Sequence, residues 1–150
     1  MLYQYMPTNQ IAMLGVLFAF ILTFFCLRFP FSFLPKDQGR EFAVNGALSK
    51  GKIRGVGLIL TSVFIISTLL FLPITREYIV YCILLFAMML SGYLDDAAKN
   101  PWSDYKKGAI DLALSLLTMW NFINYNSTTV QFGIYEWEIP VPLYFVLGVI

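Results

Sequence analysis

The sequence predicts an all-α polytopic membrane protein, with four transmembrane helices, the start of a fifth and a small β-hairpin on the outer face. Three observations predict this class. Hydrophobic residues make up 59% of the chain and charged residues only 13%, whereas a soluble domain carries about 25% charge. The apolar residues are gathered in long runs, and nearly all cations lie in two of the segments between those runs.

The apolar runs give the spans in chain order. About 20 apolar residues cross the ~30 Å hydrocarbon core of a bilayer. The predicted spans cover residues 11–29, 56–72, 78–94 and 109–125, and an incomplete fifth covers residues 141–150. Ten helical residues cover only about half of the hydrocarbon thickness. We therefore expect the chain to be the N-terminal part of a longer protein with one multi-span membrane domain.

The segment between the fourth and fifth runs has a different pattern. Residues 128–139 alternate apolar and polar side chains around Gly133, which predicts a β-hairpin. We expect one of its faces to rest on the membrane or on helix ends. Glu136 and Glu138 should then point to water.

The distribution of cations predicts the topology. Six of the ten Lys and Arg residues lie within residues 28–54 and three within residues 99–107, while Arg76 is the tenth. Because cytoplasmic loops carry the excess of cations, both basic loops are predicted to be cytoplasmic and the N-terminus to be outside. Asn45 and Tyr105 should therefore be cytoplasmic, and Gly133 external.

Two adjacent carboxylates, Asp95 and Asp96, stand at the end of the third apolar run. Acids at a membrane edge are costly unless a cation, a metal or water compensates them, and carboxylate oxygens suit Mg²⁺. Taken alone, the pair is explained about equally well as the end of a helix. Asp111, inside the fourth run, is a further functional candidate, unless it stays at the water interface. The chain has no histidine, so it offers no His ligand or His base.

Cations and glycines are combined in residues 49–57, Ser-Lys-Gly-Lys-Ile-Arg-Gly-Val-Gly, directly before the second span. Exposed backbone amides and cations of this kind suit diphosphate oxygens. The alternative is a loop that only sets topology, which explains the cations well and the glycines poorly. On the predicted topology this loop and the acid pair face one compartment, which is the arrangement that phosphoryl transfer needs.

The acid pair and the basic loop resemble motifs of a known enzyme family. Residues 92–99, Gly-Tyr-Leu-Asp-Asp-Ala-Ala-Lys, are similar to the Gly-x-x-Asp-Asp-x-x-Lys motif of polyprenyl-phosphate N-acetylhexosamine-1-phosphate transferases. Residues 34–46 and 49–57 resemble the loop of the phospho-N-acetylmuramoyl-pentapeptide transferase (MraY) family. The loop departs from that family's Lys-x-Gly-Thr-Pro-Thr-Met-Gly-Gly pattern at Ile53, Arg54 and Val56, and Ser49 stands at the position of its lysine.

The resemblance implies an Mg²⁺-dependent enzyme of peptidoglycan synthesis in the bacterial cytoplasmic membrane. It would transfer phospho-N-acetylmuramoyl-pentapeptide from UDP to undecaprenyl phosphate, forming lipid I and UMP on the cytoplasmic face. Asp95 would orient the lipid phosphate or accept its proton, and Asp96 would support it and the metal. Both are therefore catalytic and metal candidates. The implied substrate-binding residues are Lys50, Asn45, Arg54 and Lys99, with Lys50 or a neighbour holding the diphosphate.

The same resemblance places the main metal ligand downstream of Ile150, so the chain alone should be catalytically incomplete. The lipid bilayer is an expected partner, nucleic acid is not, and a homodimer is one option. Two other functions stay open. One is transfer of N-acetylglucosamine-1-phosphate from its UDP carrier to a polyprenyl phosphate. The other is a non-catalytic membrane fragment or subunit.

Overall fold

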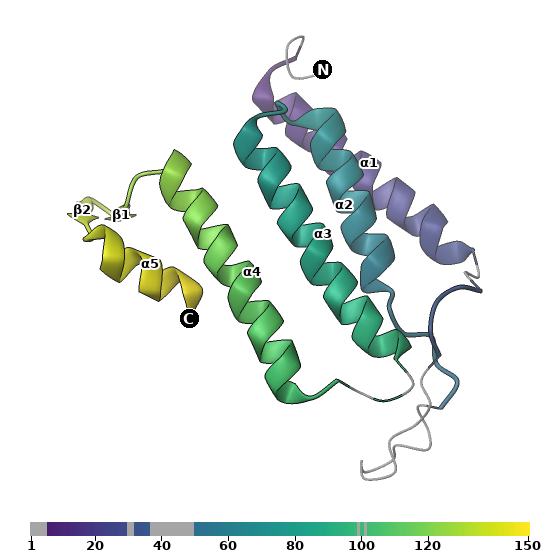
Figure 1. The fold of residues 1–150 in the computed structure, drawn as a ribbon. Helices are drawn as coiled ribbons and strands as arrows, with labels where there is room; N and C mark the ends of the chain where they lie inside the picture. Colours follow the sequence, from purple (N-terminus) through teal and green to yellow (C-terminus); the bar gives the residue numbers. More distant parts are fainter. Residues whose placement is uncertain (1–5, 30–31, 37–49, 99, 101) are drawn as a thin grey trace. The chain divides into compact units, whose positions relative to one another are not determined.

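The computed structural model describes residues 6–29, 32–36, 50–98, 100 and 102–150. Within them the chain forms five helices and one hairpin (Figure 1). Two compact units divide the chain, Met1–Ile74 with Met89–Trp102 and Thr75–Met88 with Ser103–Ile150. The elements are α1 (Thr8–Arg28), α2 (Gly57–Phe71), α3 (Arg76–Ala97), α4 (Asp104–Tyr125), β1 (Thr129–Phe132), β2 (Tyr135–Glu138) and α5 (Val141–Val149).

Prolines in the sequence explain where α1 and α2 end. The residue before a proline is sterically pushed from helical to extended backbone. Phe29, before Pro30, has φ −85° and ψ 131° and follows the last residue of α1. Leu72, before Pro73, has φ −97° and ψ 158° and follows the last residue of α2. The ends of these two apolar runs are therefore set by local chemistry.

The third and fourth helices are longer than the apolar runs predict. At the start of α3 the Tyr78 N–H donates to the Thr75 hydroxyl at 3.3 Å, which satisfies one of the unpaired amides of the first turn. The helix begins at Arg76, two residues before the predicted third span starts at residue 78. Its last turn includes Asp95 and Asp96, so both acids lie on the helix, directly after the predicted span of residues 78–94. Similarly, α4 begins at Asp104 rather than at residue 109.

Two helices of the described chain are long and apolar enough to cross a membrane, α1 with 21 residues and α3 with 22. The helix α2 is apolar but has 15 residues. The helix α4 has 22 residues and carries Asp104, Lys106, Lys107 and Asp111. The mostly helical fold is confirmed, and the count of four crossing helices stays a prediction.

In the first unit α1 packs against α2. The Phe18 and Phe71 rings lie with centroids 5.5 Å apart, and a Cβ on Gly15 would be 3.5 Å from the Phe71 ring. The buried core consists of Leu34, Ile59 and Val63. The side chains packed around it are Ala19, Leu22, Cys26 and Tyr93. This core therefore joins both helices, the segment after α1 and the end of α3.

In the second unit α4 packs against α5, and the first half of α3 contributes a polar contact. The Phe122 and Tyr144 rings stack with centroids 5.9 Å apart. Buried Asn121 donates to the Glu77 carbonyl oxygen at 3.3 Å, and the Asn126 side-chain amide donates to the Glu77 carboxylate at 2.7 Å. These two bonds hold the C-terminal part of α4 to the start of α3.

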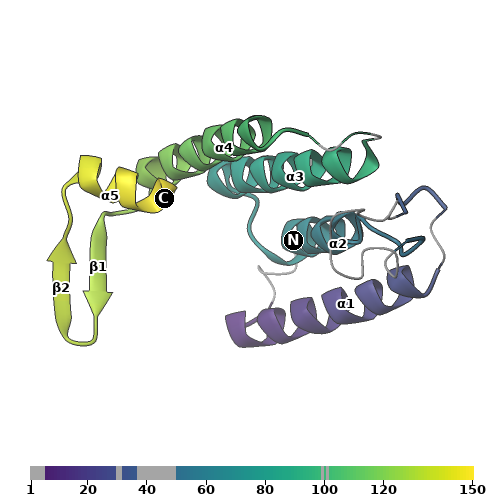
Figure 2. The same ribbon diagram turned by 90° about the horizontal axis from the view of Figure 1, so that it is seen from below.

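The predicted hairpin is confirmed. The two strands pair antiparallel from Thr129 opposite Glu138 to Phe132 opposite Tyr135, joined by a turn in which Gly133 has φ 63°. Figure 2 shows the two strands side by side, connected to α4 and α5 and extending away from these helices. Both strands are exposed along their whole length, Glu136 and Glu138 included, and which face meets water stays a prediction.

Candidate active site at the end of α3

The two ends of the basic loop are joined to each other. The Arg54 N–H donates to the Pro35 carbonyl oxygen at 2.8 Å, and Lys36 forms an isolated antiparallel bridge with Ile53. We call these four residues the loop base. It brings the segment after α1 next to the segment before α2, so the loop between them starts and ends at one place.

The side chain of Tyr93, on the last turns of α3, holds this loop base. Its hydroxyl donates to the Phe33 carbonyl oxygen at 3.2 Å. Its ring leaves no room beside Gly55, since a Cβ there would be 3.1 Å from Tyr93 Cδ2 and 3.3 Å from Pro35 Cδ. Gly55 also has φ 74°, a conformation that residues with a side chain rarely adopt. The close approach of loop and helix therefore requires glycine at this position.

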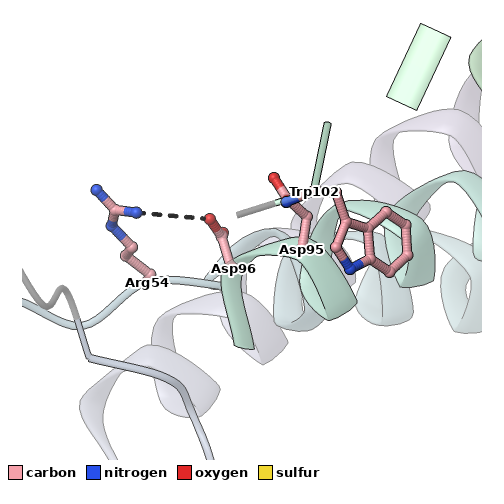
Figure 3. Close-up of polar contacts among 4 residues, drawn as sticks. All are labelled: Arg54, Asp95, Asp96 and Trp102. Atoms are coloured by element: carbon pink, nitrogen blue, oxygen red, sulfur yellow. Dashed lines mark hydrogen bonds and ion pairs between the residues drawn. The ribbon is translucent and has the colours of Figure 1, made fainter. Parts of the chain in front are cut away.

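Asp96 faces the same loop base. Residues three apart lie on one face of a helix, so Asp96 follows Tyr93 on the side toward the loop. Its Oδ1 lies 3.9 Å from Arg54 Nη1, and the two side chains are 38% and 32% exposed (Figure 3). An exposed pair at this distance contributes about 0–1 kcal/mol to stability. The pair matters for position rather than for stability, because it places a cation of the basic loop beside a carboxylate of α3.

Asp95 points elsewhere, as expected for the neighbouring position on a helix (Figure 3). Its Oδ1 accepts a hydrogen bond of 2.8 Å from the Trp102 N–H. This bond fixes the orientation of a half-buried carboxylate through the segment that follows α3. The two adjacent acids thus have different partners, Arg54 for Asp96 and the backbone of Trp102 for Asp95.

The donor set at this helix end fits Mg²⁺. No group of three or more His, Cys, Asp or Glu side chains that could hold a metal is found in the part of the chain that the structure describes. Mg²⁺ does not need one, because it typically takes one or two carboxylates and completes its shell with waters and substrate phosphates. Asp95 and Asp96 supply carboxylates of this kind, so both stay candidates for the metal.

The remaining predicted site residues are distributed as follows. Lys50 is exposed in a turn in which Gly51 has φ 86°. Asn45 and Lys99 lie outside the described residues. Asp111 is exposed on α4, and both interpretations of this acid stay predictions.

Sequence reasoning missed Tyr93 and Trp102. Tyr93 occupies an unspecified position of the acid motif, and the only signal was its helical spacing to Asp96. Trp102 contributes its backbone N–H, which bonds Asp95. A backbone donor has no sequence signal of its own.

The proteins that this chain resembles are transferases. Over 99 residues it is 37% identical to two phospho-N-acetylmuramoyl-pentapeptide-transferases, both from strains of Treponema pallidum. The match covers 66% of this chain and 27% of each relative, so the chain spans about a quarter of their length. The resemblance indicated by the motifs is confirmed as a partial match to this family. No family model matches the chain, and no solved structure does.

Proposed function

We propose that this chain is part of an enzyme that transfers phospho-N-acetylmuramoyl-pentapeptide from UDP to undecaprenyl phosphate, forming lipid I and UMP. The similarity to the two treponemal transferases carries the proposal. The geometry supports it, because the acid motif ends a helix next to the joined ends of the basic loop. The alternative nucleotide sugar, UDP-N-acetylglucosamine, has no observation in its favour.

Asp95 is the residue that we assign to the lipid phosphate. Its Oδ1 is held by the Trp102 N–H, so the carboxylate meets a substrate in a fixed orientation. There it would accept the proton of the phosphate or orient the attacking oxygen. Such positioned proton transfer typically contributes ~10²–10⁴ in rate.

Arg54 and Lys50 are the cations that we assign to the diphosphate of the nucleotide substrate. Arg54 is held at the site by its backbone bond to Pro35 and its ion pair with Asp96. Phosphoryl transfer depends mainly on positioning and charge neutralisation, which fixed cations supply. Asn45 and Lys99 complete the proposed set of substrate-binding residues.

Mg²⁺ would be held by Asp96 and Asp95 together with substrate oxygens and a ligand from the rest of the protein. When bound, it would neutralise charge on the diphosphate. The Arg54 guanidinium, 3.9 Å from the Asp96 carboxylate, would lie close to this metal.

The test is direct assay of the whole protein in detergent or vesicles. With undecaprenyl phosphate and UDP-N-acetylmuramoyl-pentapeptide we expect UMP release and a new lipid product. The same assay with UDP-N-acetylglucosamine is the matched control and should give no product. Turnover with the control sugar alone would redirect the assignment to the other transferase class, and no turnover with either would refute it.

The proposal also requires the site to face the cytoplasm. In a background without Cys26 and Cys82, a cysteine at Tyr105 should react with a membrane-impermeant maleimide only after the cytoplasmic side is opened. A cysteine at Asn45 should behave in the same way. A cysteine at Gly133 should react from outside, and labelling of position 133 only from the cytoplasmic side would reverse the topology.

A further inference from the structure

The hairpin has one apolar and one polar face. Cross-strand partners lie on the same face of an antiparallel pair, and successive residues alternate between faces. The register therefore sorts all eight strand residues by chemistry. We call the apolar side the aromatic face; it consists of Val130, Phe132, Tyr135 and Trp137, and the opposite face of Thr129, Gln131, Glu136 and Glu138.

The aromatic face is open. Phe132 is 81% exposed, Trp137 68% and Tyr135 65%, and the turn residue Ile134 adds a side chain that is 89% exposed. A contiguous set of exposed large apolar side chains typically marks a surface that contacts something other than water.

The same face continues into the helices of its unit. At the base of the hairpin, Val130 and Ile139 line an apolar hollow of about 340 Å³. The other residues of this hollow come from α4 and α5, namely Met119, Phe122, Tyr144, Leu147 and Gly148. The aromatic face thus extends the apolar surface of α4 and α5 beyond the ends of these helices.

We propose that the aromatic face lies in the boundary between lipid headgroups and acyl chains, so that the hairpin rests on the bilayer surface. Trp and Tyr are enriched at this depth because their rings are apolar with a polar group. A two-stranded hairpin has unpaired backbone groups along both outer edges, so it is excluded from the hydrocarbon core but not from the hydrated boundary. Glu136 and Glu138, on the opposite face, stay in water.

The charges of the segment make this attachment independent of anionic lipid. Residues 126–150 contain two glutamates and no Lys or Arg. Attraction to acidic headgroups requires cations near the surface, and none is present here. The hairpin should therefore bind uncharged phosphatidylcholine as well as it binds a bilayer rich in anionic lipid.

Spin labels on the two faces test the proposal in the whole protein after removal of Cys26 and Cys82. The protein is reconstituted in phosphatidylcholine vesicles and, in parallel, in vesicles rich in anionic lipid. Phe132→Cys and Trp137→Cys report the aromatic face, and Gln131→Cys and Glu136→Cys are matched controls on the polar face. Relaxation by oxygen, which enriches in lipid, is compared with relaxation by a water-soluble nickel complex. We expect oxygen to dominate at 132 and 137 and nickel to dominate at 131 and 136.

Each other result overturns the proposal in a recognisable way. Nickel access at all four positions would mean that the hairpin stands clear in water. Low access to both reagents at 132 and 137 would mean that another part of the protein covers the aromatic face. A preference for oxygen that appears only with anionic lipid would refute the charge argument. None of these results depends on whether the protein transfers a phospho-sugar.

Discussion

The end of α3 and the hairpin both carry acidic side chains in a mostly apolar chain, and they are stabilised by different kinds of contact. At the end of α3, contacts join residues far apart in sequence, as between Tyr93 and Phe33 or between Asp96 and Arg54. The hairpin is held by a ladder between two strands joined by a two-residue turn. One region is a junction of several segments, and the other is a local unit with an exposed face.

This difference predicts where substitutions act. A change at the junction should alter the relative placement of loop, helix end and carboxylates, and so should affect activity. A change in the hairpin should stay local. The following predictions are ordered from the largest expected effect to the smallest.

Replacing Asp95 with Asn in the whole protein should lower lipid I synthesis by ~10²–10⁴, because the amide cannot accept the phosphate proton. The Asn side-chain oxygen still accepts the Trp102 N–H, so folding should be preserved, as judged by an unchanged thermal unfolding midpoint. The matched control is Asp104→Asn in the first turn of α4, which should be mild. Near-normal synthesis by Asp95→Asn would mean that Asp95 is not catalytic and that the acid pair only ends the helix.

The Asp96→Asn variant should also be severe, but with a different signature. If Asp96 holds the proposed Mg²⁺, loss of its charge should raise the Mg²⁺ concentration needed for half-maximal rate, with partial rescue by excess metal. The measurement is a Mg²⁺ titration of the initial rate, run in parallel with Asp95→Asn. An unchanged Mg²⁺ requirement would exclude Asp96 from the metal environment.

Three glycines of the basic segment form a graded series. Gly55→Ala should destabilise most, because it meets both a positive φ and the Tyr93 ring at 3.1 Å. Gly51→Ala has the positive φ but no atom within 4 Å, so it should cost only the backbone strain of about 1–2 kcal/mol. Gly57 has no positive φ and no atom within 4 Å of an added Cβ, and it begins α2. Gly57→Ala should therefore be neutral or slightly stabilising. Thermal unfolding in detergent gives the order, and equal effects at 51 and 55 would contradict the contact with Tyr93.

Tyr93→Phe is the smallest change at the junction. It removes the hydrogen bond to the Phe33 carbonyl and leaves the ring beside Gly55, so we expect a loss of about 1 kcal/mol. Local opening should rise accordingly, seen as faster hydrogen exchange at the Arg54 amide. The control is Tyr135→Phe in the hairpin, which should leave exchange at Arg54 unchanged.

Much of the fold was predictable because its signals are local. Apolar runs give the helices, Pro30 and Pro73 follow the ends of α1 and α2, and alternation around Gly133 gives the hairpin. The start of α4 was misjudged because Lys106 and Lys107 were assigned to a loop. Charged residues are good helix formers, so a polar stretch next to an apolar run continues the helix unless a breaker intervenes.

The candidate site was predictable only in outline. That the basic loop and the acid pair would be neighbours followed from charge and topology, and the Arg54–Asp96 pair agrees with it. Which residues meet could not be derived, because these contacts depend on tertiary packing. Motif spacing grouped Asp95 with Asp96, whereas the helix directs them to Trp102 and Arg54 respectively.

The loop base has a consequence in polymer terms. The bridge between Lys36 and Ile53 already brings together the ends of an intervening segment of about 16 residues. Closing a loop of that length costs about 2 kcal/mol of chain entropy, and each doubling of the length adds only about 0.6 kcal/mol. Insertion of a few residues between Lys36 and Ile53 should therefore change the stability of the loop base little.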